Sequence, residues 1–68
     1  MNKIKNEKDF LQFLITIADE NHIVDLNQVV KESWLPPKKS INYLNYFGLQ
    51  GYFYHYDDSH VVLIKYQI

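Results

Sequence analysis

The segment from Leu35 to Phe53 constrains the fold more than any other part of the chain. It begins with Pro36 and Pro37: a proline disfavours helical geometry in the residue before it and is well placed in the first turn of a helix. Apolar residues then recur at helical spacing as far as Gly51, a residue type that ends many helices in the left-handed conformation. The segment therefore predicts a sharp turn, a helix that begins at Pro37, a glycine stop and a strand.

The two sides of this predicted helix differ in chemistry. Its only ionised side chains are Lys38 and Lys39, both at the start, and Gly48 would allow a neighbouring element to approach closely. The helical period predicts a buried seam made of Ile41, Leu44 and Phe47, and an opposite, solvent-facing side that holds Asn42, Tyr43 and Tyr46.

Two further helices and a short strand are predicted before this segment. Asn6 can cap a first helix that runs from about Glu7 to Glu20, with acidic residues in its first turn. The pair Ile23-Val24 suits a brief strand, and Asp25 can cap a second helix. This second helix is expected to bury Leu26, Val29 and Val30, and to stop near Ser33 or Trp34, with the Trp34 ring closing the core over the turn.

A hairpin is predicted at the end of the chain. Residues 52–56 alternate tyrosines with Phe53 and His55, residues 57–59 form a turn, and residues 60–66 are rich in Val, Leu and Ile. The turn would bring His55 opposite His60. A metal site is not expected there, because such a site normally needs three or four well-placed ligands.

Size and composition limit the possible functions. Sixty-eight residues predict a single domain over 1–68, and the absence of cysteine leaves neither a disulfide nor a thiolate metal site. No apolar run reaches membrane-spanning length, so we expect a cytoplasmic protein with no membrane partner. No catalytic motif or glycine-rich phosphate loop is present, so we expect neither an enzyme nor a cofactor.

The predicted order α, β, α, α, β, β and the pattern Leu44-x-x-Phe47-x-x-x-Gly51-Tyr52-Phe53 resemble the winged helix-turn-helix superfamily. The resemblance extends from Glu7 to Lys65. It implies an α+β fold with three helices and a C-terminal hairpin wing, in which the third helix enters the major groove of DNA. The residues that would contact nucleic acid, carried over by position, are Lys38, Lys39, Ser40, Asn42, Tyr43 and Tyr46.

The leading hypothesis is a small protein that binds double-stranded DNA, as a transcriptional or replication accessory factor. Lys38 and Lys39 would neutralise phosphate, Asn42 would bond an adenine edge, and a homodimer would gain affinity and site length. A composition rich in Asn, Lys, Ile and Tyr indicates an AT-rich genome, such as that of a mobile element or virus.

There are two alternatives to duplex-DNA binding, and the charge of the chain supports the first. Seven lysines, no arginine and eight acids give a net charge of −1, and the predicted turn holds Asp57 and Asp58 where DNA-contacting wings are usually basic. The chain would then dock on a larger protein partner through its tyrosine-rich face. In a third hypothesis Tyr43 and Tyr46 stack the bases of single-stranded nucleic acid.

Overall fold

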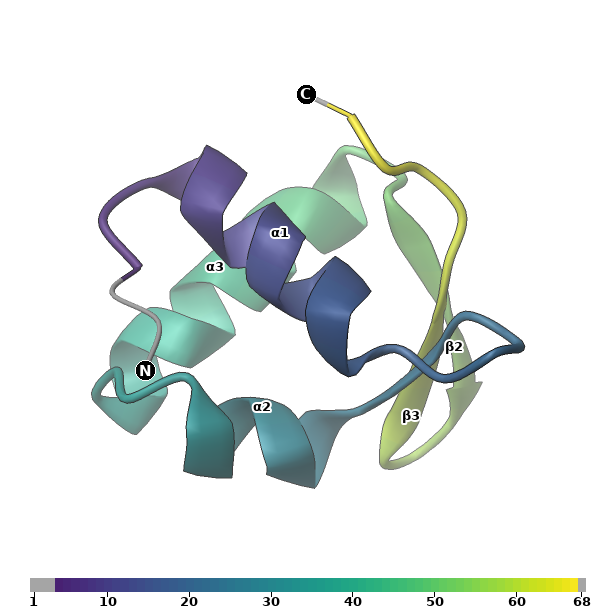
Figure 1. Ribbon diagram of the computed structural model, residues 1–68, viewed down its shortest axis with the longest axis horizontal. Coiled ribbons are helices and arrows are strands. Elements are labelled where there is room, and N and C mark those ends of the chain that lie inside the picture. Colours follow the sequence, from purple (N-terminus) through teal and green to yellow (C-terminus); the bar gives the residue numbers. More distant parts are fainter. Residues whose placement is uncertain (1–3, 68) are drawn as a thin grey trace.

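The computed structural model describes residues 4–67, which form a small α+β fold of three helices and a three-stranded antiparallel sheet (Figure 1). The fold class and the order of elements agree with the prediction. None of the helices within residues 4–67 is long and apolar enough to cross a membrane. In chain order the elements are α1 (Glu7–Ile17), β1 (Ile23–Asp25), α2 (Leu26–Glu32), α3 (Pro37–Leu49), β2 (Phe53–Asp57) and β3 (His60–Leu63).

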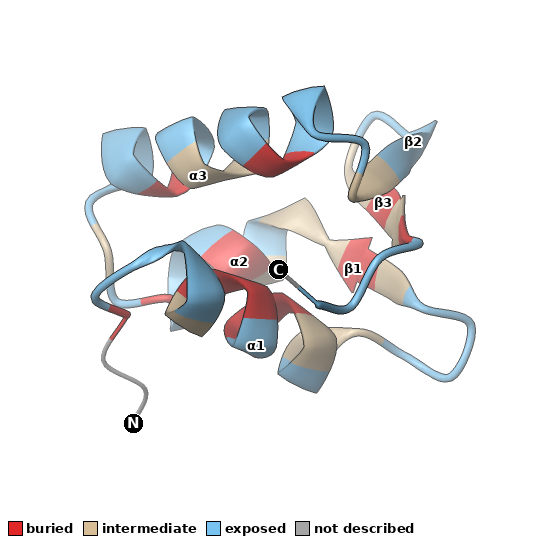
Figure 2. Cartoon of the chain, turned by 90° about the horizontal axis from the view of Figure 1, so that it is seen from above, coloured by how far each residue is buried: buried red, intermediate tan, exposed pale blue. Residues whose placement is uncertain are grey.

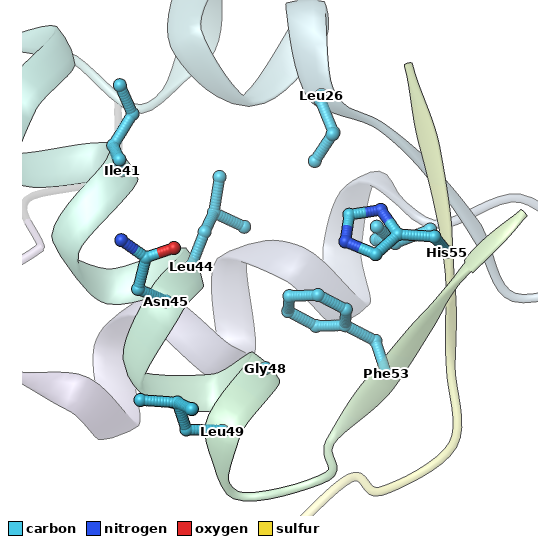
Figure 3. Close-up of a pocket in the computed structure, with 9 residues that line it drawn as sticks. Leu26, Ile41, Leu44, Asn45, Gly48, Leu49, Phe53 and His55 are labelled. Atoms are coloured by element: carbon cyan, nitrogen blue, oxygen red, sulfur yellow. The ribbon is translucent and has the colours of Figure 1, made fainter. Parts of the chain in front are cut away.

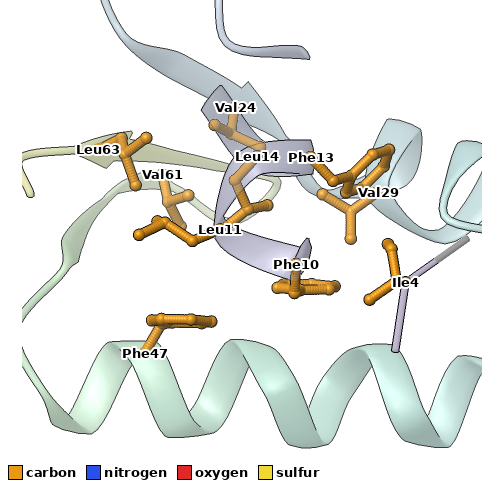
Figure 4. Close-up of a cluster of buried hydrophobic side chains, with 10 residues drawn as sticks. All are labelled: Ile4, Phe10, Leu11, Phe13, Leu14, Val24, Val29, Phe47, Val61 and Leu63. Carbon is orange, nitrogen blue, oxygen red and sulfur yellow. The ribbon is translucent and has the colours of Figure 1, made fainter. Parts of the chain in front are cut away.

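The hydrophobic core lies between α1, α3 and the sheet (Figure 4). The fully buried ring of Phe10 on α1 stacks on Tyr43 with 4.8 Å between centroids, and lies nearly parallel to Phe47 at 6.1 Å. Such aromatic pairs add about 0.5–1.5 kcal/mol beyond the area that they bury. The buried hydrophobic residues of the core are Ile4, Phe10, Leu11, Phe13, Leu14, Val24, Val29, Phe47, Val61 and Leu63.

The helix termini largely follow the local sequence. The Asn6 side chain caps α1 by accepting a hydrogen bond from the N–H of Asp9 at 2.9 Å, and Asp25 caps α2 in the same way. The predicted end of α1 at Glu20 is wrong, because Ala18 already has extended geometry. The Asp19 carboxylate accepts hydrogen bonds from the N–H groups of Asn21 and Ile23, and these local bonds replace the last helical turn.

The end of α3 is a Schellman motif, as the glycine stop predicts. Gly51 has a φ of +76°, and its N–H bonds to the carbonyl of Gly48. The N–H of Tyr52 bonds to the carbonyl of Phe47, and the two rings pack edge to face at 4.9 Å. These contacts turn the chain directly from α3 into β2. The Phe53 ring lies 3.4 Å from where a Cβ of Gly48 would be, which is an ordinary van der Waals contact.

The sheet has the order β1-β3-β2, so the last strand lies in the middle. Ile23 and Tyr54 pair with Val62 from opposite sides. The register shifts between His55 and Asp57, which places Tyr56 in a bulge near the turn. The strand predicted over 60–66 ends at residue 63, because the next two N–H groups, of residues 64 and 65, both bond to the carbonyl of Tyr52.

The turn between α2 and α3 differs from the prediction. Trp34 does not close the core: it has a φ of +61° and 71% of its surface is exposed. The buried residues here are Ser33 and Ser40, whose hydroxyl oxygens lie 3.0 Å apart. Two small hydroxyl side chains, and not the indole, are therefore the buried groups at this turn. Val30 is also more exposed than predicted, since Val29 fills the core position of α2.

Replacing Gly51 with Ala tests whether this residue ends α3. No atom lies within 4 Å of the added Cβ, so the cost is the left-handed backbone alone, and the free energy of unfolding should fall by about 1–2 kcal/mol. Gly48→Ala is the matched control, because a better helix former there should leave stability unchanged or raise it by up to about 1 kcal/mol. Urea denaturation measures both, and equal losses would contradict the assignment of the stop to Gly51.

Candidate functional site

The rotation of α3 about its own axis determines which side chains are available for binding. The predicted seam is displaced by one residue: Phe47 is buried as expected, but Ile41 is 51% exposed and Ser40 is fully buried in its place. Tyr43 lies half-buried against Phe10 instead of facing solvent. The buried side of the helix therefore follows Ser40, Tyr43 and Phe47, with Leu44 at its edge.

A polar row runs along the outward side of α3. Lys38, Asn42 and Asn45 are all exposed and occupy positions i, i+4 and i+7, which lie above one another on a helix. Figure 2 shows this outward side as a continuous exposed surface over α3. Asn45 was missed by the sequence analysis, although its spacing from Asn42 could have identified it. Lys39 and the 43% exposed Tyr46 flank the row.

Ser40 is not available for contact with a ligand. It is fully buried, and its hydroxyl shares a hydrogen bond with Ser33, whose oxygen also accepts from the N–H of Leu35 at 3.3 Å. Its role in this fold is to hold the two helices together.

The amino terminus of α3 is open. Its cap position is Pro36, which provides no side-chain hydrogen bond, and within residues 4–67 the N–H of Lys38 has no backbone acceptor. The N–H groups of Lys39 and Ser40 both bond to the Pro36 carbonyl. Neither lysine forms an ion pair with a carboxylate of the described residues. The free N–H of Lys38, the helix dipole and two unpaired ammonium groups together make this end attractive to anions.

The tyrosines do not form one face. Tyr43 stacks on Phe10 and Tyr52 packs on Phe47, so both belong to the core. Tyr54 lies opposite Val62 in the sheet, and Tyr66 contacts the ring of His22 with 5.3 Å between centroids. The exposed tyrosine rings therefore lie on separate parts of the surface.

A groove lies between α3 and β2, and we call it the α3–β2 groove (Figure 3). Its volume is about 520 Å³. One wall consists of Ile41, Leu44, Asn45, Gly48 and Leu49 from α3. The other parts are Leu26 at the start of α2, Phe53 and His55 from β2, and Val61 from β3. No aspartate, glutamate, lysine or arginine lines it, so it presents an apolar surface with one amide and one imidazole.

The turn of the hairpin is an acidic cluster that surrounds one histidine. The predicted pairing of His55 with His60 is wrong, because the bulge places His55 opposite Val61 and His60 opposite Asp57. His60 Nδ1 lies 2.8 Å from Asp57 Oδ1, and its Nε2 lies 3.9 Å from Asp25 Oδ2. Asp57 also accepts a hydrogen bond from the N–H of Ser59. The cluster thus joins the hairpin turn to the cap of α2.

Each partner in this cluster shifts the pKa of the other. The hydrogen bond that His60 donates to Asp57 raises the pKa of His60, and the charges of Asp57, Asp25 and Asp19 act in the same direction. The hydrogen bonds from His60 and from the Ser59 N–H lower the pKa of Asp57. Burial opposes both shifts only in part, so the charged pair is favoured.

No protein-family model, curated protein or solved structure matches this chain. Its function must therefore be argued from the chemistry of these surfaces. Within residues 4–67, no three His, Asp or Glu side chains are placed as ligands of one metal ion. The arrangement offers a polar row with a cationic end, a neighbouring apolar groove and a separate acidic turn.

Replacing Ser40 with Ala should lower the free energy of unfolding by about 1–2 kcal/mol, because the buried Ser33 hydroxyl loses a partner. Asn42→Ala, two residues along on the exposed side, should change stability by less than about 0.5 kcal/mol. Guanidinium denaturation of the two variants measures the difference. A neutral Ser40→Ala would show that the hydroxyl pair does not hold α2 and α3 together.

The His60–Asp57 pair should make stability depend on pH. Because the folded pKa of His60 is raised, its contribution is complete below the ordinary value of 6.5 and is lost as pH rises through the folded value. Because the folded pKa of Asp57 is lowered, the contribution of Asp57 to stability is present above the ordinary pKa of 3.8. It is lost as pH falls through the folded pKa. The pair is therefore most stabilising near pH 5.

Asp57→Asn tests this dependence, since asparagine retains an acceptor for the Ser59 N–H but has no charge. Its destabilisation should be larger at pH 5 than at pH 8, measured by urea denaturation at each pH. Asp58→Asn is the control, because the Asp58 side chain forms no hydrogen bond or ion pair within residues 4–67. If the destabilisation of the two variants depended on pH to the same extent, the dependence could not be assigned to the His60–Asp57 pair.

Proposed function

We propose that this protein is a small DNA-binding protein of the winged-helix type, with α3 as its recognition helix and duplex DNA as its ligand. The observation that supports this best is the exposed row Lys38, Asn42, Asn45 on the outward side of α3. The element order and the hairpin that follows α3 directly fit the same interpretation. The expected role is that of a transcriptional or replication accessory factor.

Phosphate contact is assigned to the start of α3. Lys38 and Lys39 are exposed, have no ion-pair partner among residues 4–67, and project from a helix end with a free N–H group. Contacts of this kind fix the register of a protein on DNA without reading its sequence. Each neutralised phosphate releases counterions, so affinity should fall steeply as salt rises.

Base contact is assigned to the middle of α3. Asparagine can bond the N6 and N7 positions of adenine through the major groove, and Asn42 and Asn45 offer two such side chains on one face. Tyr46 lies on the flank of this face, from which its hydroxyl can reach the backbone. The stretch from Lys38 to Tyr56 contains no acidic residue that would repel DNA.

The hairpin turn is assigned no DNA contact in this proposal. Asp57 and Asp58 are exposed there, and only the charge of Asp57 is balanced, by His60. A recognition helix without a basic wing buries little surface on DNA, so useful affinity calls for a second copy on an adjacent half-site.

The two alternatives differ in support. Protein docking is favoured by a specific observation, the uncharged α3–β2 groove, although the tyrosines do not form the single face first expected. Stacking of single-stranded bases has less support, because one face of the Tyr43 ring is already covered by Phe10.

Lys38→Glu/Lys39→Glu should weaken binding to duplex DNA at least about tenfold in low salt, and should reduce the slope of log affinity against log salt by about 2. Fluorescence anisotropy with labelled duplex and single-stranded oligonucleotides of equal length, at several salt concentrations, measures both quantities. Tighter binding to the single strands than to the duplex would favour the stacking alternative.

The matched control is Lys5→Glu/Lys8→Glu, which changes the net charge equally at the start of α1, where both side chains are exposed. It should change affinity much less than the α3 variant. Equal losses would mean that net charge alone governs binding, and no binding of the wild type to any DNA would refute the proposed function.

A further inference from the structure

The α3–β2 groove is too open to enclose a small molecule. Two residues of its α3 wall, Leu49 and Ile41, are 89% and 51% exposed. Pockets for small ligands usually bury about 70–90% or more of the ligand surface, which walls of this kind cannot do. An exposed aliphatic surface of this shape is typical of contact with another protein.

The chemistry of the groove also disfavours nucleic acid as its occupant. It has no lysine or arginine to neutralise a phosphate, and the two lysines of α3 lie beyond one end of it. The leucine and isoleucine side chains provide no planar ring on which a base could stack. The two rings that line the groove are those of Phe53, which is half-buried against Gly48, and of His55.

The groove is lined by residues from several elements, among them β2, which is an edge strand of the sheet. Figure 3 shows Leu44 from α3, Leu26 from α2, and Phe53 and His55 from β2 around the same space. Recognition through such walls is the mode used for an amphipathic helix, whose apolar side chains insert at positions i, i+3 or i+4, and i+7. From Ile41 to Leu49 the wall rises about 12 Å, enough for about two turns of a docked helix.

The positive charge at one end of the groove indicates how a docked helix would be oriented and which residues it would have at that end. Lys38 precedes Ile41 by three residues, so it lies one turn away on the same side of α3, at one end of the groove. It is exposed and has no carboxylate partner within residues 4–67, and the free amino terminus of α3 adds positive potential there. A partner with acidic residues at the corresponding end would neutralise this charge, whereas a basic partner would be repelled.

We propose that the α3–β2 groove binds an amphipathic helix of a partner protein, with its apolar stripe in the groove and its acidic end over Lys38. The site adjoins the polar row assigned to DNA: Asn45 belongs to both, and Lys38 lies at the end of both. If the proposed function is correct, the docked helix and DNA therefore exclude each other, and the partner acts as a competitive regulator of DNA binding.

Two synthetic peptides of about 16 residues provide the test. Both have leucines at i, i+3, i+4 and i+7, and they differ only at one end, which has three glutamates or three lysines. In heteronuclear NMR titrations without DNA, the glutamate peptide should shift the amide signals of residues 41–49 and 53–55 and bind at least about tenfold more tightly than the lysine peptide.

Three variants complete the test. Leu49→Lys should abolish binding of the glutamate peptide without affecting the fold, because that side chain is almost fully exposed. Ile64→Lys, at an exposed position outside the groove, should leave binding unchanged. Lys38→Glu should reverse the preference between the peptides. Binding of neither peptide at about 1 mM, equal binding of both, or shifts confined to other residues would overturn the proposal.

Competition separates this inference from the proposed function. The glutamate peptide should displace duplex DNA from the wild type in the anisotropy assay. If the protein binds no DNA but the NMR titration maps to the groove, the docking site stands and the DNA-binding function fails. Simultaneous binding of peptide and DNA would refute the competitive relationship.

Discussion

The position of Phe47 is the constraint on which the rest of the structure depends. Its ring is fully buried, lies parallel to Phe10 on α1, and packs edge to face against Tyr52 immediately after the helix. Because its backbone carbonyl also accepts the N–H of Tyr52, one residue fixes both the rotation of α3 and its exit into β2. The rotation of α3 in turn places the polar row on the outward side of the helix, and it places Ile41 and Leu49 at the α3–β2 groove. A change in this packing would alter both candidate surfaces together.

The two surfaces of α3 have opposite chemistry although they are adjacent. The outward row offers amides and an ammonium group, which match a polyanion with hydrogen-bonding base edges. The groove offers exposed aliphatic side chains, whose burial contributes about 25 cal/mol per Å² but gives no attraction to phosphate. Lys38 and Asn45 are at the boundary and are the residues that either ligand would use. These shared residues are the physical reason that the two proposed ligands would compete.

The acidic cluster has a structural role at the other end of the sheet. His60 lies in the central strand, so its contacts with Asp57 and Asp25 connect β2, β3 and the cap of α2. The bond from the N–H of Leu26 to the carbonyl of Ser59 joins the same elements through the backbone. The acids near the turn therefore help to hold the hairpin against the start of α2, which is also where Leu26 enters the groove. This role accounts for carboxylates at a place where a DNA-contacting wing would have cations.

Local chemistry, by itself, determined where the helices begin and end: the caps at Asn6 and Asp25, the break before Pro37, and the stop at Gly51. Each depends on one residue and its immediate neighbours, so the α+β class, the element order and the two lysines at the start of α3 could be predicted from the sequence. Only tertiary packing decided the rotation of α3, since the helical period fits two seams that share Phe47, and the packing of Phe47 on Phe10 together with the Ser33–Ser40 contact selected the second. Packing also left Trp34 exposed, and the bulge at Tyr56 separated His55 from His60. The groove became recognisable only then, because a surface between α3 and β2 depends on how distant residues pack.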